Sequence, residues 1–261
     1  TSKVGQKNIK DFNLEVIESF EKRRRFQVSV STLNIDLRCI NTFTNWLLDH
    51  DYIDKKIKVK QHKAPKLPEK YICEQNFKKL INEESIPSWV RDACKVYWRY
   101  GFRKNELIEG QLAPNKMLLI PAELSKTNTE YSIQLEPWAV KIIREVHRRR
   151  DEDRAKGHRD ENFGERLSEL VIDGYKKIGF YEVNRTNLHS LRHSFGCRMY
   201  LVSGDIAQVQ VAMRHEDDKS TKGYVNLNKD ELLRDFPTSA KNSRFLDNME
   251  RIEQDNKDSL S

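Results

Sequence analysis

The sequence predicts a mainly helical protein with a small antiparallel β-sheet. Charged residues make up 33% of the 261 residues and hydrophobic residues 37%, which is typical of chains rich in amphipathic helices. Apolar residues recur at helical spacing through much of the chain. Only two short apolar segments, MLLI (residues 117–120) and YSIQL (residues 131–135), resemble strands. Ten glycines and seven prolines are too few for a turn-rich all-β fold.

Residues 1–60 are predicted to form a helical domain. Phe12, Val16 and Phe20 recur every fourth residue, ahead of the basic run EKRRRF at residues 21–26. The segment VSVSTLN then offers Ser and Thr caps for a second helix. The apolar stripe of that second helix consists of Leu33, Leu37, Ile40, Phe43 and Leu47. Each stripe is most simply the buried face of a helix.

A basic segment with two prolines, KKIKVKQHKAPKLPEK, occupies residues 55–70 and predicts a linker over 61–70. Residues 1–66 hold 14 Lys/Arg and 8 Asp/Glu, so 14 − 8 = +6 of the total charge of +7 lies in the first quarter of the chain. This asymmetry favours a nucleic-acid partner, whereas a solvated hinge is the alternative interpretation of the segment itself.

Residues 71–236 are predicted to form a second domain of helices and strands. Helices are expected near residues 74–83, 88–100, 137–150, 163–178, 188–203, 205–213, 219–225 and 229–235, with residues 151–162 as a charged loop or frayed helix. Val140, Ile143 and Val146 should point inward, and Gly204 should end the helix before it. The tail, residues 237–261, is either disordered or a segment that docks on another protomer.

Composition also bounds the setting of the protein. The four cysteines are scattered at positions 39, 73, 94 and 197, which predicts neither a thiolate metal site nor a disulfide framework and favours a reducing compartment. The chain has no apolar run long enough to span a membrane and no signal-peptide core. We therefore expect a cytoplasmic protein without a membrane partner.

The segment NLHSLRHSFG (residues 187–196) clusters His189, Arg192 and His193 on a helix whose other side is apolar. A metal site, a solvated polar face and a cradle for an anion are the three interpretations. The metal site is the weakest, because a zinc-protease helix requires Glu where Ser190 stands and because an arginine between the ligands would repel a cation.

An anion cradle needs cations from elsewhere in the chain. Arg103 lies at a helix junction in YGFRKNEL, Lys126 in the connector between the two strands, and His215 nine residues before Tyr224. Each residue has a plainer interpretation when it is taken alone. Arg103 could form an ion pair with Glu106, and Lys126 could be a solvated turn residue. His215 could cap a helix, and Tyr224 could belong to the core.

In this order the segments GFRKNEL, SKTNTEYSIQL, LHSLRHSFG and RHEDDKSTKGY resemble the tyrosine recombinases, the integrase family of site-specific DNA recombinases. The resemblance covers about residues 67–236 as the catalytic domain, and residues 8–55 resemble the helical core-binding domain. It implies that the two domains form a C-shaped clamp around double-stranded DNA. It also implies a homotetramer on DNA and accessory DNA-bending proteins as partners.

The resemblance implies a role for each residue of the set. Arg103 and Arg192 would bind the non-bridging oxygens of the scissile phosphate, and Tyr224 would attack it to give a 3′-phosphotyrosine. Lys126 would protonate the leaving 5′-oxygen, His189 would assist proton transfer at the tyrosine, and His215 would hydrogen-bond the phosphate. No metal or cofactor is required. His193 is interpreted as a polar residue that orients its neighbours, Cys197 and Tyr200 as core, and Glu106 as the partner of Arg103.

Contacts to the DNA backbone are expected from eight further cations: Lys22, Arg23, Arg24, Arg25, Lys56, Lys58, Lys60 and Arg214. Arg214 stands where the family usually has glycine, so it either alters the local backbone or reaches a phosphate. The expected role is integration, excision or transposition of a mobile element in a prokaryotic nucleoid. A dimer resolvase of the same family and a type IB topoisomerase-like strand transferase are the alternatives.

Overall fold

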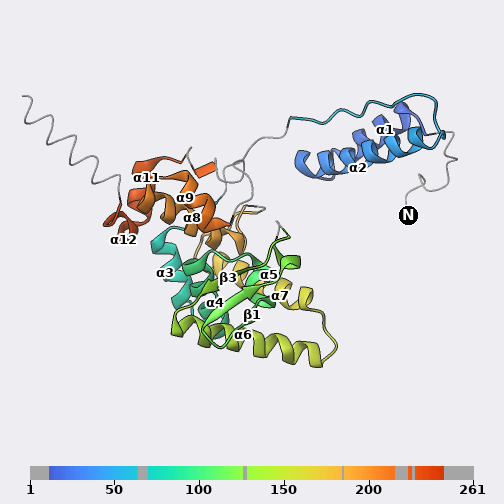
Figure 1. Ribbon diagram of the computed structural model, residues 1–261. Helices are drawn as coiled ribbons and strands as arrows, with labels where there is room; N and C mark the ends of the chain where they lie inside the picture. The colour runs from blue at the N-terminus through green and yellow to red at the C-terminus, as the bar shows by residue number, and fades with distance from the viewer. Residues whose placement is uncertain are drawn as a thin grey trace, which may run out of the picture. The chain divides into compact units, whose positions relative to one another are not determined.

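The computed structural model describes residues 12–63, 70–125, 128–183, 185–214, 223–224 and 227–243 (Figure 1). The predicted fold class is confirmed, because the chain is mainly helical with a small three-stranded antiparallel sheet. The helices are α1 (Leu14–Arg24), α2 (Val30–Asp49), α3 (Glu74–Asn82), α4 (Ser88–Tyr100), α5 (Lys104–Glu109), α6 (Pro137–Ala155), α7 (Asp160–Lys177), α8 (His189–Ser203), α9 (Ile206–Met213), α11 (Lys229–Asp235) and α12 (Pro237–Ala240). The strands are β1 (Gln111–Leu112), β2 (Met117–Ile120) and β3 (Tyr131–Gln134), and η3 (Ala122–Leu124) is a short 3-10 helix.

The chain divides into two compact units, Thr1–Leu67 and Pro68–Ser261. In the first unit, α1 and α2 pack through Ile17, Leu33, Leu37 and Leu47. The side chain of Ser29 caps α2 as predicted, accepting a hydrogen bond from the backbone N–H of Thr32 at 3.2 Å. The expected clamp of the two units around DNA stays a prediction.

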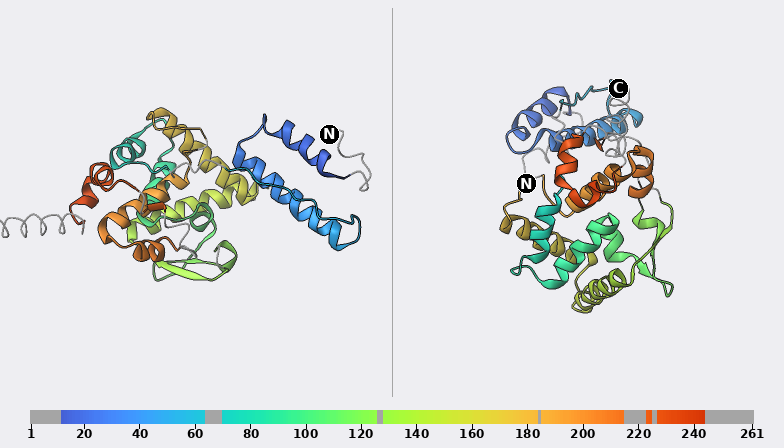
Figure 2. Two further views of the ribbon diagram at one scale, coloured as in Figure 1. Left: turned by 90° about the horizontal axis from the view of Figure 1, so that it is seen from above. Right: turned by 90° about the vertical axis from the view of Figure 1, so that its left-hand side faces the viewer.

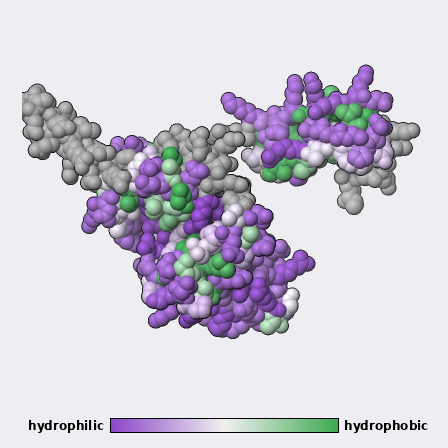
Figure 3. Space-filling view, viewed as in Figure 1, coloured by the Kyte–Doolittle hydropathy of each residue, from purple (hydrophilic) through white to green (hydrophobic). Residues whose placement is uncertain are grey.

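The apolar stripe predicted on α2 is wrong at Phe43, which is 43% exposed. Its ring is stacked on Trp46, with the ring centroids 6.2 Å apart, and Trp46 is itself stacked on His50 and Tyr52. Apolar residues are accordingly visible on the surface of this unit (Figure 3). The helical period placed Phe43 on the buried side, but a unit of two helices has too little interior to cover it.

The first residues of the predicted linker are hydrogen-bonded to the first unit. The backbone N–H of His62 donates to Asn34 Oδ1 at 2.8 Å, and Asn34 Nδ2 donates to the carbonyl of His62 at 2.7 Å. The His62 ring lies 2.7 Å from Glu21. Between α2 and His62, Lys56, Lys58 and Lys60 are exposed and alternate with half-buried Ile57 and Val59. Residues 55–63 therefore run along α1 and α2 with the lysines turned to solvent.

The second unit has two apolar clusters joined by α8. Leu188 and Leu191 belong to the larger cluster with α3, α4, α6 and α7, whereas Cys197 and Tyr200 belong to the smaller one with α9 and α11. Helices α8, α9, α11 and α12 stay together at one end of the unit in every view (Figures 1 and 2). Arg192 therefore lies on α8 where the two clusters meet.

Several local predictions are confirmed and some are wrong. Val140, Ile143 and Val146 are buried, and Gly204 ends α8 with φ of 64°. The charged stretch 151–162 is more helical than predicted, because α6 continues to Ala155 and α7 already begins at Asp160. Arg148 pairs with Glu145 and Glu152 along α6, which supports the extra turn.

Strand β1 was not predicted, since two residues give no readable period. The helix predicted at 219–225 lies mostly outside the described residues.

The start of the predicted tail packs on the unit to which it is attached. Thr238 on α12 donates from its backbone N–H and its hydroxyl to the carboxylate of Glu74 on α3, at 3.0 and 2.5 Å. Phe236 is fully buried, and Ser243 donates to the carbonyl of Leu201 at 2.7 Å. Docking of the tail on another protomer stays a prediction for residues 244–261, which lie outside the described residues. No helix within the described ranges is long and apolar enough to cross a membrane.

Gly101→Ala should lower the free energy of unfolding by about 3 kcal/mol. Gly101 has φ of 62°, which disfavours any side chain, and an added Cβ would lie 2.3 Å from a ring carbon of Phe195. Gly157→Ala is the matched control, because Gly157 has φ of 84° but nothing within 4 Å of the added Cβ. It should cost only about 1 kcal/mol. Equal losses in urea titrations followed by circular dichroism would contradict this packing role.

Candidate active site around Glu106

Arg103 is positioned by the sharp turn between α4 and α5. Gly101 ends α4 in the left-handed conformation that glycine adopts without strain. Arg103 is the residue before the first turn of α5. Its backbone N–H donates to Glu106 Oε2 at 2.8 Å, and its guanidinium donates to Glu106 Oε1 at 2.6 Å. The predicted pairing of Arg103 with Glu106 is therefore present, and it fixes both the backbone and the side chain of the arginine.

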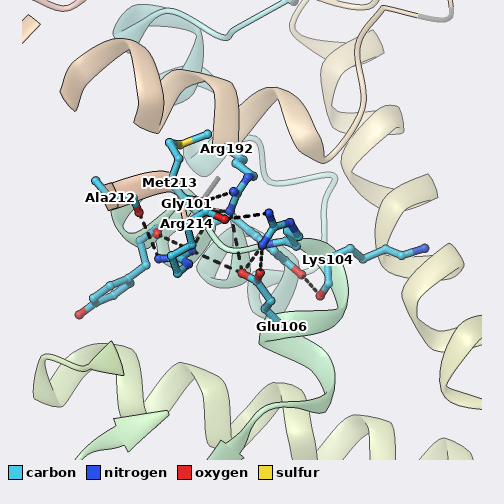
Figure 4. Close-up of polar contacts among 10 residues, drawn as sticks. Gly101, Lys104, Glu106, Arg192, Ala212, Met213 and Arg214 are labelled. Carbon is cyan, nitrogen blue, oxygen red and sulfur yellow. Dashed lines mark hydrogen bonds and ion pairs between the residues drawn. The ribbon is translucent and has the colours of Figure 1, made fainter. Parts of the chain in front are cut away.

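Arg192 is almost completely buried, with 1% of its surface exposed. Its two terminal nitrogens donate to the carbonyls of Gly101 and Met213, and it lies 3.9 Å from Glu106 (Figure 4). Its Nε has no hydrogen-bond partner among the described residues. The sequence predicted an arginine facing an anion, but not that both of its terminal nitrogens would donate to backbone carbonyls.

Arg214 is the third guanidinium at this carboxylate. It ends α9 with φ of 54° and ψ of 46°, so an arginine adopts the left-handed conformation that glycine favours. Its Nη2 donates to Gly101 O at 3.2 Å and lies 3.4 Å from Glu106 Oε2. Its guanidinium also lies 5.5 Å from the ring centroid of Tyr131. The contact with Glu106 offsets the backbone strain, which explains how the glycine position accepts an arginine.

The three arginines also satisfy the carbonyls that end α9. Arg103 donates to Arg214 O at 3.1 Å, Arg192 to Met213 O, and Arg214 to Ala212 O at 3.3 Å. The last carbonyls of a helix lack partners within the helix and carry its negative dipole end. The end of α9 is therefore a second anchor for the same guanidiniums that gather around Glu106.

Burial and charge oppose each other at Glu106, which is fully buried. Burial by itself raises the pKa of this carboxyl, but Arg214, the backbone N–H of Arg103 and Arg192 together outweigh it and hold the pKa below 4.5. Burial lowers the pKa of Arg192 to about 10, and the charge of Arg103 adds to this effect. Because arginine keeps its charge in proteins, three guanidiniums and one carboxylate give the cluster a charge of 3 − 1 = +2.

Beside Arg192, helix α8 presents a second group of side chains, His189 and His193, which lie near Tyr224. The ring of His193 lies edge-to-face on that of His189, with centroids 4.6 Å apart, and its Nδ1 is 3.2 Å from the hydroxyl of Tyr224. His189 is exposed, and beside it lies a pocket of about 220 Å³ that Lys104 and Asn187 also line. Lys104 points away from the arginines (Figure 4). The structure thus places His193, which had no firm sequence role, directly on Tyr224.

The remaining predicted site residues are placed unevenly. Lys126 and His215 lie outside the described residues. Tyr131 pairs with Ile120 where β2 ends and β3 begins, and the ring of Tyr131 lies against the guanidinium of Arg214. Lys22, Arg23 and Arg25 are exposed on the first unit, whereas Arg24 pairs with Asp36 at 2.8 Å. No group of three or more His, Cys, Asp and Glu side chains in the described part of the chain could hold a metal ion.

The arrangement combines a positively charged cluster of arginines with a tyrosine hydroxyl held against the same helix as Arg192. Arginine forks bind phosphate oxygens in two-point fashion and keep their charge. A cluster with a surplus of two positive charges in a partly buried setting stabilises the charge that develops on a phosphoryl group under attack. Tyr224 and the α8 histidines would supply the attacking oxygen and a proton acceptor.

A protein-family model and several solved structures match this chain. Residues 70–231 match the model of the family described as the Phage integrase family. A search of curated protein sequences found no match.

Solved structures with a similar fold include the following three. A lambda integrase dimer bound to a COC′ core site is 15% identical with a TM-score of 0.61, over 82% of this chain and 65% of that chain. The Tn1549 transposon integrase in complex with circular intermediate DNA is 14% identical with a TM-score of 0.57, over 89% and 87%. XerH site-specific recombinase in its post-cleavage complex with palindromic difH is 18% identical with a TM-score of 0.53, over 86% and 72%.

Glu106→Gln should lower the free energy of unfolding at pH 7 by about 3 kcal/mol, because it leaves three guanidiniums without their buried counter-charge. The pKa of Glu106 is depressed, so its ionised form contributes stability that is complete above pH 4.5 and is lost as the pH falls through the folded-state pKa. The variant should therefore lose less stability than the wild type on acidification, in urea titrations at a series of pH values.

Glu109→Gln on the same helix is the control for this prediction. Burial and the nearby Asp160 raise the pKa of Glu109, so its ionised form is disfavoured in the fold. Its removal should not lower stability at pH 7. A parallel loss in both variants would mean that the effect belongs to α5 in general rather than to the arginine cluster.

Proposed function

Because the chain belongs to the Phage integrase family, we propose that it is a tyrosine recombinase that cleaves and rejoins DNA strands through a 3′-phosphotyrosine. The proposal rests on one observation: three arginines, Arg103, Arg192 and Arg214, surround the buried carboxylate of Glu106. The hydroxyl of Tyr224 lies nearby, against His193 of α8. Such a site needs no metal to offset the charge of a phosphodiester.

Each group has a step in this reaction. Arg103 and Arg192 bind the two non-bridging oxygens, and the Nε–H of Arg192 is a donor that no described residue occupies. Tyr224 attacks phosphorus, and Lys126 on the hairpin protonates the leaving 5′-oxygen. His215 hydrogen-bonds the phosphate, and His189 assists at the tyrosine side. The 5′-hydroxyl of a partner strand then attacks the phosphotyrosine and restores the diester, so that no external energy source is consumed.

Double-stranded DNA is the proposed partner, bound on the first unit by the exposed cations Lys22, Arg23, Arg25, Lys56, Lys58 and Lys60. Arg24 pairs with Asp36 and Arg214 pairs with Glu106. Either arginine would contact DNA only by leaving its carboxylate partner or by binding the carboxylate and a phosphate at once. We also propose a homotetramer on the recombination site. A lambda integrase tetramer bound to a Holliday junction has the same fold, with a TM-score of 0.60.

The proposed biological role is integration, excision or transposition of a mobile element. The likeness to the Tn1549 transposon integrase supports it, and the likeness to XerH keeps a dimer resolvase as the second candidate. Plasmids carrying the flanks of a candidate element distinguish the two. A recombinase of a mobile element joins element ends to a target, whereas a resolvase recombines two copies of one chromosomal site.

Tyr224→Phe should abolish formation of a covalent protein–DNA adduct on a nicked suicide substrate, because the attacking oxygen is removed. The measurement is a denaturing gel of the trapped adduct. Tyr200→Phe is the matched control, since Tyr200 lies in the same buried cluster, and it should still form the adduct. An adduct with the Tyr224 variant, or none with the wild type on its own recombination site, would overturn the proposal.

Arg192→Lys should slow strand cleavage by about 10²- to 10³-fold, because a lysine keeps the charge but loses the two-point geometry. Arg198→Lys on the same helix is the control. Arg198 is also largely buried, and burial lowers its pKa to about 10 too, but its guanidinium binds the carbonyl of Trp98 and stacks 4.2 Å from that ring. Single-turnover cleavage should separate the two variants. Equal losses of rate would show that burial, rather than phosphate binding, explains the effect.

A further inference from the structure

The reactive end of Tyr224 rests against α8. The residue is 3% exposed. A Cβ added at Gly196 would lie 2.5, 2.6 and 2.7 Å from the Cζ, Oη and Cε1 atoms of the Tyr224 ring. The absence of a side chain at position 196 therefore lets the phenol approach the helix backbone closely. The tyrosine hydroxyl is held at one turn of α8 rather than in open solvent.

His193 is the histidine that reaches this hydroxyl. Its Nδ1 lies 3.2 Å from Tyr224 Oη, within hydrogen-bond distance, across 31 residues of sequence. Residues 193 and 196 lie on adjacent positions of one helix face, so the same turn supplies both the contact surface and the polar partner.

His189 is one turn farther along the helix. Its ring contacts the ring of His193 edge-to-face, with an interplanar angle of 87°. The resemblance assigned proton transfer at the tyrosine to His189, whereas the structure places the Nδ1 atom of His193 within hydrogen-bond distance of the tyrosine hydroxyl.

We propose that His193 accepts the phenol proton of Tyr224 when the tyrosine attacks the scissile phosphate, an inference that rests on the recombinase function proposed above. As the bond from Oη to phosphorus forms and the bond from phosphorus to the 5′-oxygen breaks, the phenol proton moves to Nδ1 of a neutral His193 ring whose proton is on Nε2. The leaving 5′-oxygen takes its proton from Lys126. In rejoining, the 5′-hydroxyl gives its proton back to Lys126 as it attacks phosphorus, and the departing phenolate recovers its proton from His193, so the site returns to its starting state.

His193→Asn tests the proton transfer separately from packing. Asparagine places an amide oxygen near the position of Nδ1, so it keeps the hydrogen bond but cannot take the proton. We expect single-turnover cleavage of the suicide substrate to fall by about 10²- to 10⁴-fold. DNA affinity in a mobility-shift assay should stay within about 2-fold, since a general base acts on the chemical step. His147→Asn is the control, because His147 is another half-buried histidine that bonds a carbonyl, that of Leu107, outside the site.

A substrate with sulfur in place of the bridging 5′-oxygen distinguishes the proton given to the leaving group from the proton taken from Tyr224. The thiolate leaves without protonation, so it restores activity to variants that lack the general acid, such as Lys126→Ala. It should not restore His193→Asn. Rescue of His193→Asn by the sulfur substrate, or cleavage within about 3-fold of the wild type on the normal substrate, would overturn the proposal.

Chemical rescue provides the second test if the asparagine variant folds poorly. In His193→Ala, added imidazole should raise the cleavage rate with its concentration, whereas a residue that only supports packing gives no such dependence. Absence of rescue in a folded, DNA-binding His193→Ala protein would contradict a proton-accepting role. Adduct formation by the wild type is measured in parallel. Its absence would refute the recombinase function and this inference together, whereas its presence with an active His193→Asn refutes this inference alone.

Discussion

The buried carboxylate of Glu106 is the constraint on which the site depends. A carboxylate without solvent needs cations, and three guanidiniums brought together need an anion, so neither could be buried alone. Glu106 is the anion that these guanidiniums share: it pairs with Arg103 at 2.6 Å and lies 3.4 Å from Arg214 and 3.9 Å from Arg192. Because one carboxylate offsets only one of three positive charges, the cluster remains complementary to a phosphate.

Backbone carbonyls complete the arrangement. The end of α9 and the carbonyl of Gly101 accept hydrogen bonds from the same arginines, which restricts their side chains before any ligand arrives. Such restriction reduces the conformational entropy that ordering long side chains on a phosphate would otherwise cost. The left-handed turn at Gly101 and the strained backbone of Arg214 are the local conditions that bring these carbonyls and guanidiniums together.

Helix α8 presents Arg192 and His193 on different sides. Arg192 points into the junction of the two apolar clusters, whereas His193 and Gly196 meet Tyr224. Since one rigid helix positions both Arg192 and the histidine that meets Tyr224, their separation is fixed by the 3.6-residue period rather than by a flexible loop.

The sequence by itself determined the fold class, most helix positions and the pairing of Arg103 with Glu106, because helical period, caps and short spacings are local properties. The order of motifs also predicted the residue types of the site. Only the tertiary structure decided that Arg214 lies beside Glu106, 108 residues away, and that His193 meets Tyr224. It also decided that Arg192 is buried on the carbonyls of Gly101 and Met213. Those contacts depend on how distant segments pack, and a local pattern of apolar residues does not encode which side chain a guanidinium or an imidazole will meet.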